Sequence, residues 1–135
     1  MSKVERRKKV AELLEQCGLD ASYADRYPHQ VSGGQGQRAA IARALAVDLK
    51  VLICDEATSA LDVTVQKRII ELLRRLKEEK NLSYLFICHN LALVQEFCDR
   101  VLVMKDGRIV EEGTPDDVIC NPQDEYTKML VEAVL

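Results

Sequence analysis

Two adjacent carboxylates, Asp55 and Glu56, follow the short apolar run Val51–Cys54 in this chain of 135 residues. An apolar run that ends in this way predicts a strand buried on both faces of a sheet. Successive residues of a strand point in different directions. One carboxylate could therefore hold Mg²⁺ while the other orients a water for phosphoryl transfer. Taken alone, the pair fits the end of a strand and the start of a turn better than a catalytic site.

A glycine-rich helix start is the second candidate for chemistry. Ser32–Gln35 precedes Arg38–Ala46, a stretch whose alanine content strongly favours helix. The start of such a helix offers a hydroxyl, unpaired backbone N–H groups and the positive end of the helix dipole, and its glycines let an anion approach closely. A phosphate would fit there. A glycine-rich turn that only caps the helix explains these residues equally well.

His89 follows a second apolar run, Leu82–Cys88, and the segment between the two runs, Val63–Lys80, has the apolar spacing of an amphipathic helix. Strand, helix and strand in this order predict a right-handed crossover and a parallel sheet whose functional groups gather at one edge. His89 could there donate a hydrogen bond to a terminal phosphate. A lone histidine at a strand end is more often structural, and His29, in a connector, has no comparable neighbours.

Flanking helices and one hairpin are predicted around this core. Before the core we expect a helix from Lys3 to about Cys17 with a capping box of Ser2 and Glu5, then a connector with one short helical turn over 18–30. After the core we expect a helix capped by Asn90 and a hairpin that turns at Asp106–Gly107. A short helix after Thr114 and a last amphipathic helix through Ala133 should follow.

The composition is that of a globular protein, with 47% hydrophobic and 30% charged residues. A net charge of −3 gives no electrostatic reason to expect nucleic acid as a partner. The basic run Arg6–Lys9 is interpreted as a solvated helix face. Five cysteines without Cys-x-x-Cys spacing favour a reduced compartment over disulfides or zinc. No segment approaches the length that spans a bilayer, so any membrane connection is expected through a partner.

Four motifs in order resemble those of ABC transporter ATP-binding subunits. Val31–Gln35 resembles the signature, Val51–Glu56 the Walker B strand with its catalytic glutamate, Ser59–Asp62 the D-loop, and His89 stands at the place of the switch histidine. The resemblance covers essentially the whole chain and points to the C-terminal half of such a subunit. The stretch Cys54–Gln66, like the tail at 121–128, is similar to subunits of peptide or nickel importers.

The resemblance implies an α/β fold, a partial P-loop NTPase-like ABC ATPase domain with a parallel sheet core and flanking helices. Residues 1–47 would form the end of the helical subdomain with the signature helix. Residues 48–112 would form the core from Walker B to the switch histidine and the hairpin, and residues 113–135 a C-terminal helical extension.

In that family, each ATP lies between the P-loop of one subunit and the signature of another. The resemblance implies that Ser32, Gly33, Gly34 and Gln35 contact the partner's ATP and that Asp62 aligns the facing subunit. It also implies that Asp55 contacts Mg²⁺ through a water and that Glu56 polarises the attacking water. His89 would contact the terminal phosphate. The implied partners are a second ATP-binding subunit, identical or different, and transmembrane permease subunits. The implied location is cytoplasmic, on the inner face of the cell membrane.

The sequence departs from the family pattern in one important respect. It contains no Gly-x-x-x-x-Gly-Lys-Ser/Thr, and residues 33–38 cannot substitute because they lack the lysine and the hydroxyl that contacts magnesium. We therefore expect the chain to be inactive alone. It could instead donate its signature to an intact ATP-binding subunit, or be a truncated inactive remnant. A soluble ABC ATPase that acts on DNA or ribosomes fits the tail and the acidic balance less well.

Two further expectations concern stability. Gly36 stands where the family commonly has a larger polar residue, and it should weaken the signature helix by about 1 kcal/mol relative to alanine. The strand that normally borders Walker B carries the P-loop and is not found in this sequence. An open apolar sheet edge promotes association, which predicts poor solubility or oligomerisation.

Overall fold

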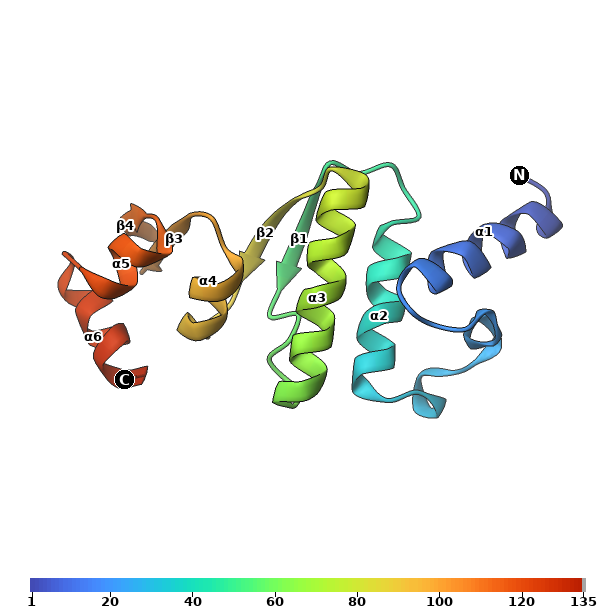
Figure 1. The fold of residues 1–135 in the computed structure, drawn as a ribbon, viewed down its shortest axis with the longest axis horizontal. Coiled ribbons are helices and arrows are strands. Elements are labelled where there is room, and N and C mark those ends of the chain that lie inside the picture. Colours follow the sequence, from blue (N-terminus) through green and yellow to red (C-terminus); the bar gives the residue numbers. More distant parts are fainter. Residues whose placement is uncertain (135) are drawn as a thin grey trace. The chain divides into compact units, whose positions relative to one another are not determined.

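The computed structural model describes residues 1–134 and divides them into two compact units, Met1–Ile87 and a second that begins at Cys88. The first unit contains, in chain order, helix α1 (Lys3–Gln16), two 3₁₀ turns η1 (Ala21–Asp25) and η2 (Pro28–Gln30), helix α2 (Gly33–Ala44), strand β1 (Val51–Asp55), helix α3 (Val63–Lys80) and strand β2 (Ser83–Ile87). Figure 1 labels its helices and strands.

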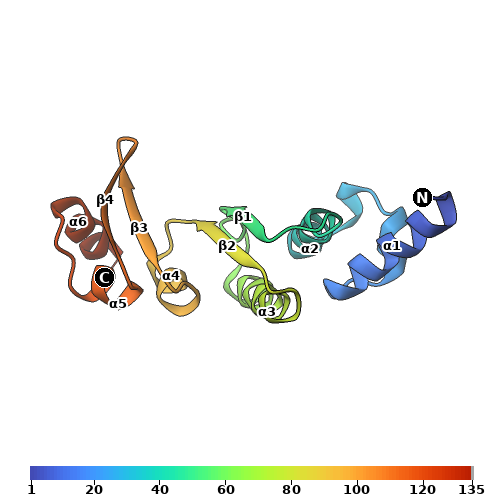
Figure 2. The ribbon, with the colours of Figure 1, turned by 90° about the horizontal axis from the view of Figure 1, so that it is seen from above.

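The two strands of the first unit pair in parallel, with Val51 opposite Ser83 and Asp55 opposite Ile87. Helix α3 connects them and lies along one face of the pair (Figure 2). Its Ile69, Leu73 and Leu76 are fully buried. The predicted parallel strand, helix, strand unit is therefore confirmed.

The expectation that β1 is buried on both faces is wrong. Cys54 is 6% exposed, whereas Ile53, the residue before it, is 63% exposed. Leu85, the partner of Ile53 in the register, and Ile87, the partner of Asp55, are exposed on the same face. Alternate residues of a strand point to opposite faces, and within the first unit helix α3 lies along one face of this sheet (Figure 2). The predicted strand is therefore apolar on both faces, although the face that carries Ile53 is exposed.

Helix α1 is tied to its neighbours at its C-terminal end. Arg38 Nη1 of α2 donates a hydrogen bond to the carbonyl of Cys17 at 2.9 Å, and Arg75 Nη2 of α3 donates one to the carbonyl of Gln16 at 2.5 Å. These are carbonyls that a helix end leaves without an intrahelical partner. At the other end of α1, the capping box of Ser2 and Glu5 is confirmed.

The second unit contains helix α4 (Leu91–Phe97), strands β3 (Val101–Lys105) and β4 (Arg108–Gly113), and helices α5 (Pro115–Cys120) and α6 (Glu125–Val134). The strands form the predicted antiparallel hairpin. Asp106 and Gly107 at its turn have φ angles of 48° and 75°, the left-handed values that a two-residue type I′ turn requires. The predicted caps by Asn90 and Thr114 are also confirmed.

None of the helices within residues 1–134 combines the length and the apolar character needed to cross a bilayer. The predicted segments 1–47, 48–112 and 113–135 differ from the two packing units. The predicted segments are defined by their roles in the family's domain, not by packing, so they stay predictions.

The uncovered face of the sheet predicts self-association. We expect the chain to sediment as species larger than a monomer, because Ile53 and Leu85 are apolar and 63% and 49% exposed. Replacing both by threonine, which keeps strand propensity, should shift the distribution toward monomer in sedimentation velocity. Val47→Thr is the matched control, since Val47 is 68% exposed but lies outside the strands. A monodisperse wild-type monomer at high concentration contradicts the prediction.

Candidate functional site

Ser32 caps helix α2 through a reciprocal pair of hydrogen bonds. Its Oγ accepts from the backbone N–H of Gln35 at 3.2 Å, and its own backbone N–H donates to Gln35 Oε1 at 2.9 Å. This capping box starts the helix at Gly33, five residues before the predicted alanine-rich stretch. The Ser32 side chain is exposed, and a hydroxyl that accepts one hydrogen bond can still donate another. The first turn therefore has the chemistry of an anion site.

The first turn of α2 lies directly against the start of α3. A β-carbon on Gly33 would come 3.3 Å from Leu61 Cδ2, and one on Gly34 would come 2.5 Å from Val65 Cγ1. A separation of 2.5 Å is a steric clash, so the backbone can approach this closely only without a side chain at Gly34. Asp62 caps α3, its Oδ1 accepting from the N–H of Val65 at 2.9 Å. The structure thus brings together the predicted signature and the predicted D-loop.

Glu56 has a left-handed backbone conformation, with φ 48°. Its N–H donates to the carbonyl of Ile87 at 2.8 Å, and its carbonyl accepts from both the N–H and the Oγ of Ser59, at 3.2 and 3.0 Å. A left-handed conformation costs a residue other than glycine about 1–2 kcal/mol. Such strain persists where surrounding bonds enforce it, and it is common at active sites. The backbone therefore changes from an extended strand at Asp55 to a left-handed conformation at Glu56.

Asp55 ends β1 with an exposed side chain. Within residues 1–134 no group of three His, Cys, Asp or Glu residues could hold a metal ion. Mg²⁺ keeps several waters and is often bound through substrate phosphates, and its water-mediated contact with Asp55 stays a prediction. Next to Asp55, burial raises the pKa of the Cys54 thiol to about 11. That thiol is therefore neutral and unreactive at neutral pH.

His89 belongs to the second unit and has an exposed side chain. It follows β2 by two residues, and β2 ends at Ile87, opposite Asp55. Asn90, next in the chain, caps α4 by accepting from the N–H of Leu93 at 3.2 Å. The structure therefore assigns His89 a place at a strand end, as predicted, and its contact with a phosphate stays a prediction.

Tyr23 is not among the predicted site residues and lies in η1, within the connector for which one short helical turn is predicted. Its Oη accepts a hydrogen bond from Gln35 Nε2 at 2.7 Å, and the guanidinium carbon of Arg26 lies 3.9 Å from the centre of its ring. Tyr23 and Gln35 are twelve residues apart. No local sequence pattern marks such a bond.

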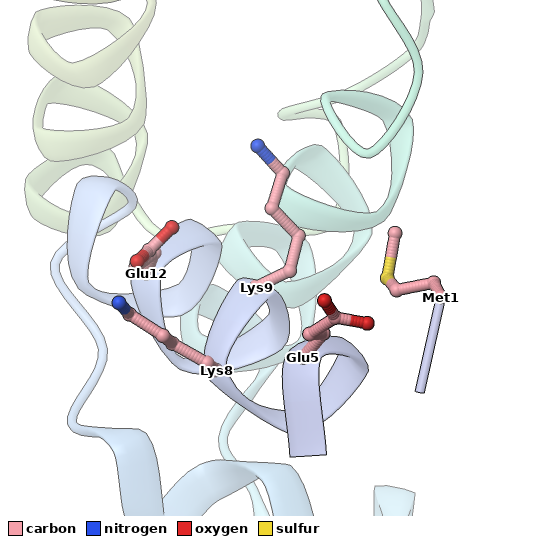
Figure 3. A pocket seen from close by; sticks show the side chains of 5 residues that line it. All are labelled: Met1, Glu5, Lys8, Lys9 and Glu12. Atoms are coloured by element: carbon pink, nitrogen blue, oxygen red, sulfur yellow. The ribbon is translucent and has the colours of Figure 1, made fainter. Parts of the chain in front are cut away.

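A shallow hollow along α1 lies elsewhere in the first unit. It is lined by Met1, Glu5, Lys8, Lys9 and Glu12 (Figure 3). The lining residues come from one exposed helix and the residue before its cap, and they carry charges of both signs. We assign no function to this hollow.

Comparison with known proteins identifies close relatives. A family model described as ABC transporter matches residues 2–59. The dipeptide transport ATP-binding protein DppF of Haemophilus influenzae is 48% identical over 98% of this chain and 41% of the relative. The oligopeptide transport ATP-binding protein OppF of Bacillus subtilis is 49% identical over 98% of this chain and 44% of the relative. The chain thus spans less than half the length of both relatives.

Solved structures agree in fold. The dimeric structure of MJ0796, a bacterial ABC transporter cassette, is 37% identical and superposes with a TM-score of 0.72 over 85% of this chain and 49% of the cassette. The structure of cbiO1 from Clostridium perfringens, part of the ABC transporter complex cbiONQ, is 35% identical, with a TM-score of 0.78 over 90% of this chain and 48% of that protein.

The contact between Gly34 and Val65 predicts opposite effects of two alanine substitutions. Gly34→Ala should lower the free energy of unfolding by about 1–2 kcal/mol, because Val65 is stiff at χ1 and cannot move aside easily. Gly36→Ala should raise it by about 0.5–1 kcal/mol, because its β-carbon would meet only Val31 Cγ2, at 3.8 Å. Urea unfolding followed by circular dichroism measures both. Equal effects of the two substitutions contradict the close approach of α2 to α3.

The conformation of Glu56 predicts that glycine is tolerated there better than alanine. Both substitutions remove the carboxylate, but only alanine keeps a β-carbon in the left-handed region. Glu56→Gly should therefore be more stable than Glu56→Ala by about 1 kcal/mol in the same unfolding experiment. At Asp55, in an extended strand, the order should reverse, with Asp55→Ala the more stable. The same order at both positions is evidence against backbone strain at Glu56.

Proposed function

Because the chain belongs to the ABC transporter family and corresponds to part of its ATP-binding domain, we propose that it supplies the signature, Walker B and D-loop elements of an ATP-dependent peptide importer. The observation that carries the proposal is the contact between Gly34 and Val65. It keeps the anion-binding turn of α2 beside the Asp62 cap, in the same unit as Asp55 and Glu56.

Two ATP molecules are relevant to this role. Ser32–Gln35 would contact an ATP bound to the P-loop of a facing subunit, with the Ser32 hydroxyl and the free N–H groups of the first turn donating to its terminal phosphate. Asp62 would align that facing subunit. Asp55 and Glu56 would serve an ATP bound to a P-loop that completes their own domain, because the 135 residues contain no such motif.

The chemistry at the second ATP is water attack on the terminal phosphate. Glu56 would orient and polarise that water, and His89 would donate a hydrogen bond to the phosphate. Asp55 would hold Mg²⁺ through a water, and the ion would offset the negative charge that develops on the phosphate oxygens. The exposed positions of all three side chains leave them accessible to a nucleotide.

The names of the relatives support peptides rather than nickel as cargo, since they are dipeptide and oligopeptide transport proteins. The dimeric cassette structure supports a second ATP-binding subunit, identical or different, as the partner. Transmembrane permease subunits would bind the assembly to the inner face of the cell membrane. Nucleic acid is not a proposed partner.

Mixing the chain with an intact oligopeptide importer subunit, such as OppF of Bacillus subtilis, tests the signature role. We expect no Mg²⁺-dependent ATP hydrolysis by the chain alone. The mixture should exceed the rate of the intact subunit alone, because the chain would complete the site at that subunit's P-loop. Ser32→Ala should reduce this gain by roughly 10- to 100-fold, the effect of losing one hydrogen bond to a charged group.

Glu56→Gln is the matched control for the mixture. Glu56 would serve the other ATP, so the gain should persist in that variant. Hydrolysis by the chain alone that Glu56→Gln abolishes would show that the chain needs no added P-loop. Absence of a gain in the mixture identifies an inactive remnant and contradicts the proposal.

A further inference from the structure

Tyr23 is placed to act on the signature through Gln35. The Gln35 side chain bridges two groups, since its Nε2 donates to Tyr23 Oη at 2.7 Å while its Oε1 accepts from the backbone N–H of Ser32 at 2.9 Å. The Ser32 bond fixes which end of the amide is the oxygen, because an N–H requires an acceptor. Both ends of the Gln35 amide are therefore held, and its orientation is determined.

Tyr23 is itself held in place. It lies in the 3₁₀ turn η1, which begins at the Asp20 cap, where Oδ1 accepts from the N–H of Ser22 at 2.9 Å. The Arg26 guanidinium carbon lies 3.9 Å from the centre of the tyrosine ring, a cation–π contact. The ring is half-buried. These restraints make the hydroxyl a fixed acceptor rather than a mobile one.

The consequence reaches the Ser32 hydroxyl. Ser32 Oγ accepts from the backbone N–H of Gln35, so the poses of the two residues depend on each other. Without the Tyr23 hydroxyl, Gln35 Nε2 loses its acceptor and its side chain gains rotamers. The bond from Ser32 N–H to Oε1 then weakens, and Ser32 no longer has one orientation.

We propose that Tyr23 is a positioning residue for the signature: through the amide of Gln35 it holds Ser32 in the orientation that recognises the phosphate. Phosphate recognition by Ser32 rests on the proposed function, whereas the orientation of Ser32 rests on these hydrogen bonds alone. In this arrangement the effect of Tyr23 passes through Gln35.

Hydrogen exchange tests the orientation without any nucleotide. The backbone N–H of residue 35 reports on its bond to Ser32 Oγ. Tyr23→Phe, which removes only the hydroxyl, should speed exchange at that N–H by about 2- to 10-fold, the effect of one neutral hydrogen bond. Tyr27→Phe is the matched control and should leave the rate unchanged, because Tyr27 is exposed and its ring stacks on His29 instead.

A double-mutant cycle separates action through Gln35 from a general structural role. In Gln35→Met, which has no amide, Tyr23→Phe should add no further exchange at residue 35. Unchanged exchange in Tyr23→Phe, or an additive effect in the double variant, overturns the proposal.

The mixture with the intact importer subunit then tests the link to phosphate. Tyr23→Phe should lower the gain in ATP hydrolysis by about 2- to 10-fold, while Tyr27→Phe leaves it intact. If the wild-type mixture shows no gain, the proposed function fails, and the exchange experiment still decides whether Tyr23 orients Ser32. If Tyr23→Phe speeds exchange at residue 35 but gives the same gain in ATP hydrolysis as the wild-type chain, the link to phosphate recognition is overturned.

Discussion

The close approach of helices α2 and α3 at their first turns is the constraint on which the candidate site depends. A β-carbon at Gly34 would lie 2.5 Å from Val65 Cγ1, so the two helix starts meet only because that position has no side chain. Val65 also donates its backbone N–H to the Asp62 cap. One residue of α3, Val65, therefore packs against Gly34 of the proposed signature and donates to Asp62 of the proposed D-loop. Any shift of α2 along α3 would separate the two motifs.

Helix α1 and the turn η1 support this contact through hydrogen bonds and packing. Arg38 and Arg75 donate to the last carbonyls of α1 from α2 and α3 respectively, so α1 is bonded to both helices that carry the site. Helix α1 then packs against η1, the turn that presents Tyr23 to Gln35. The exposed ion pair between Arg7 and Asp25 also links α1 to this turn, but such pairs contribute little. The hydrogen bonds of Arg38 and Arg75 join α1 to both helices in addition.

Local signals in the sequence predicted local structure well. Capping residues, the Asp106–Gly107 turn and the apolar stripe of α3 depend on neighbours within a few residues, and each is confirmed. The glycine-rich helix start predicted at Ser32–Gln35 agrees with α2, which begins at Gly33 because the Ser32 cap outweighs the low helix propensity of glycine. Burial of β1 could not be predicted, since an apolar strand gives no information about which element covers each face. The bond from Gln35 to Tyr23 depends on how η1 packs.

Hydrogen bonds of the backbone hold Glu56 in its left-handed conformation. Its N–H is bonded to Ile87 of the neighbouring strand, and its carbonyl is bonded twice to Ser59. All three bonds are made by backbone atoms of Glu56 and hold its left-handed φ, which is the condition under which local strain persists. The amide of a glutamine at this position would therefore occupy the same place as the carboxylate. It follows that a change from carboxylate to amide alters the chemistry at this position with little effect on the fold, so the contribution of the charge can be measured separately from that of the structure.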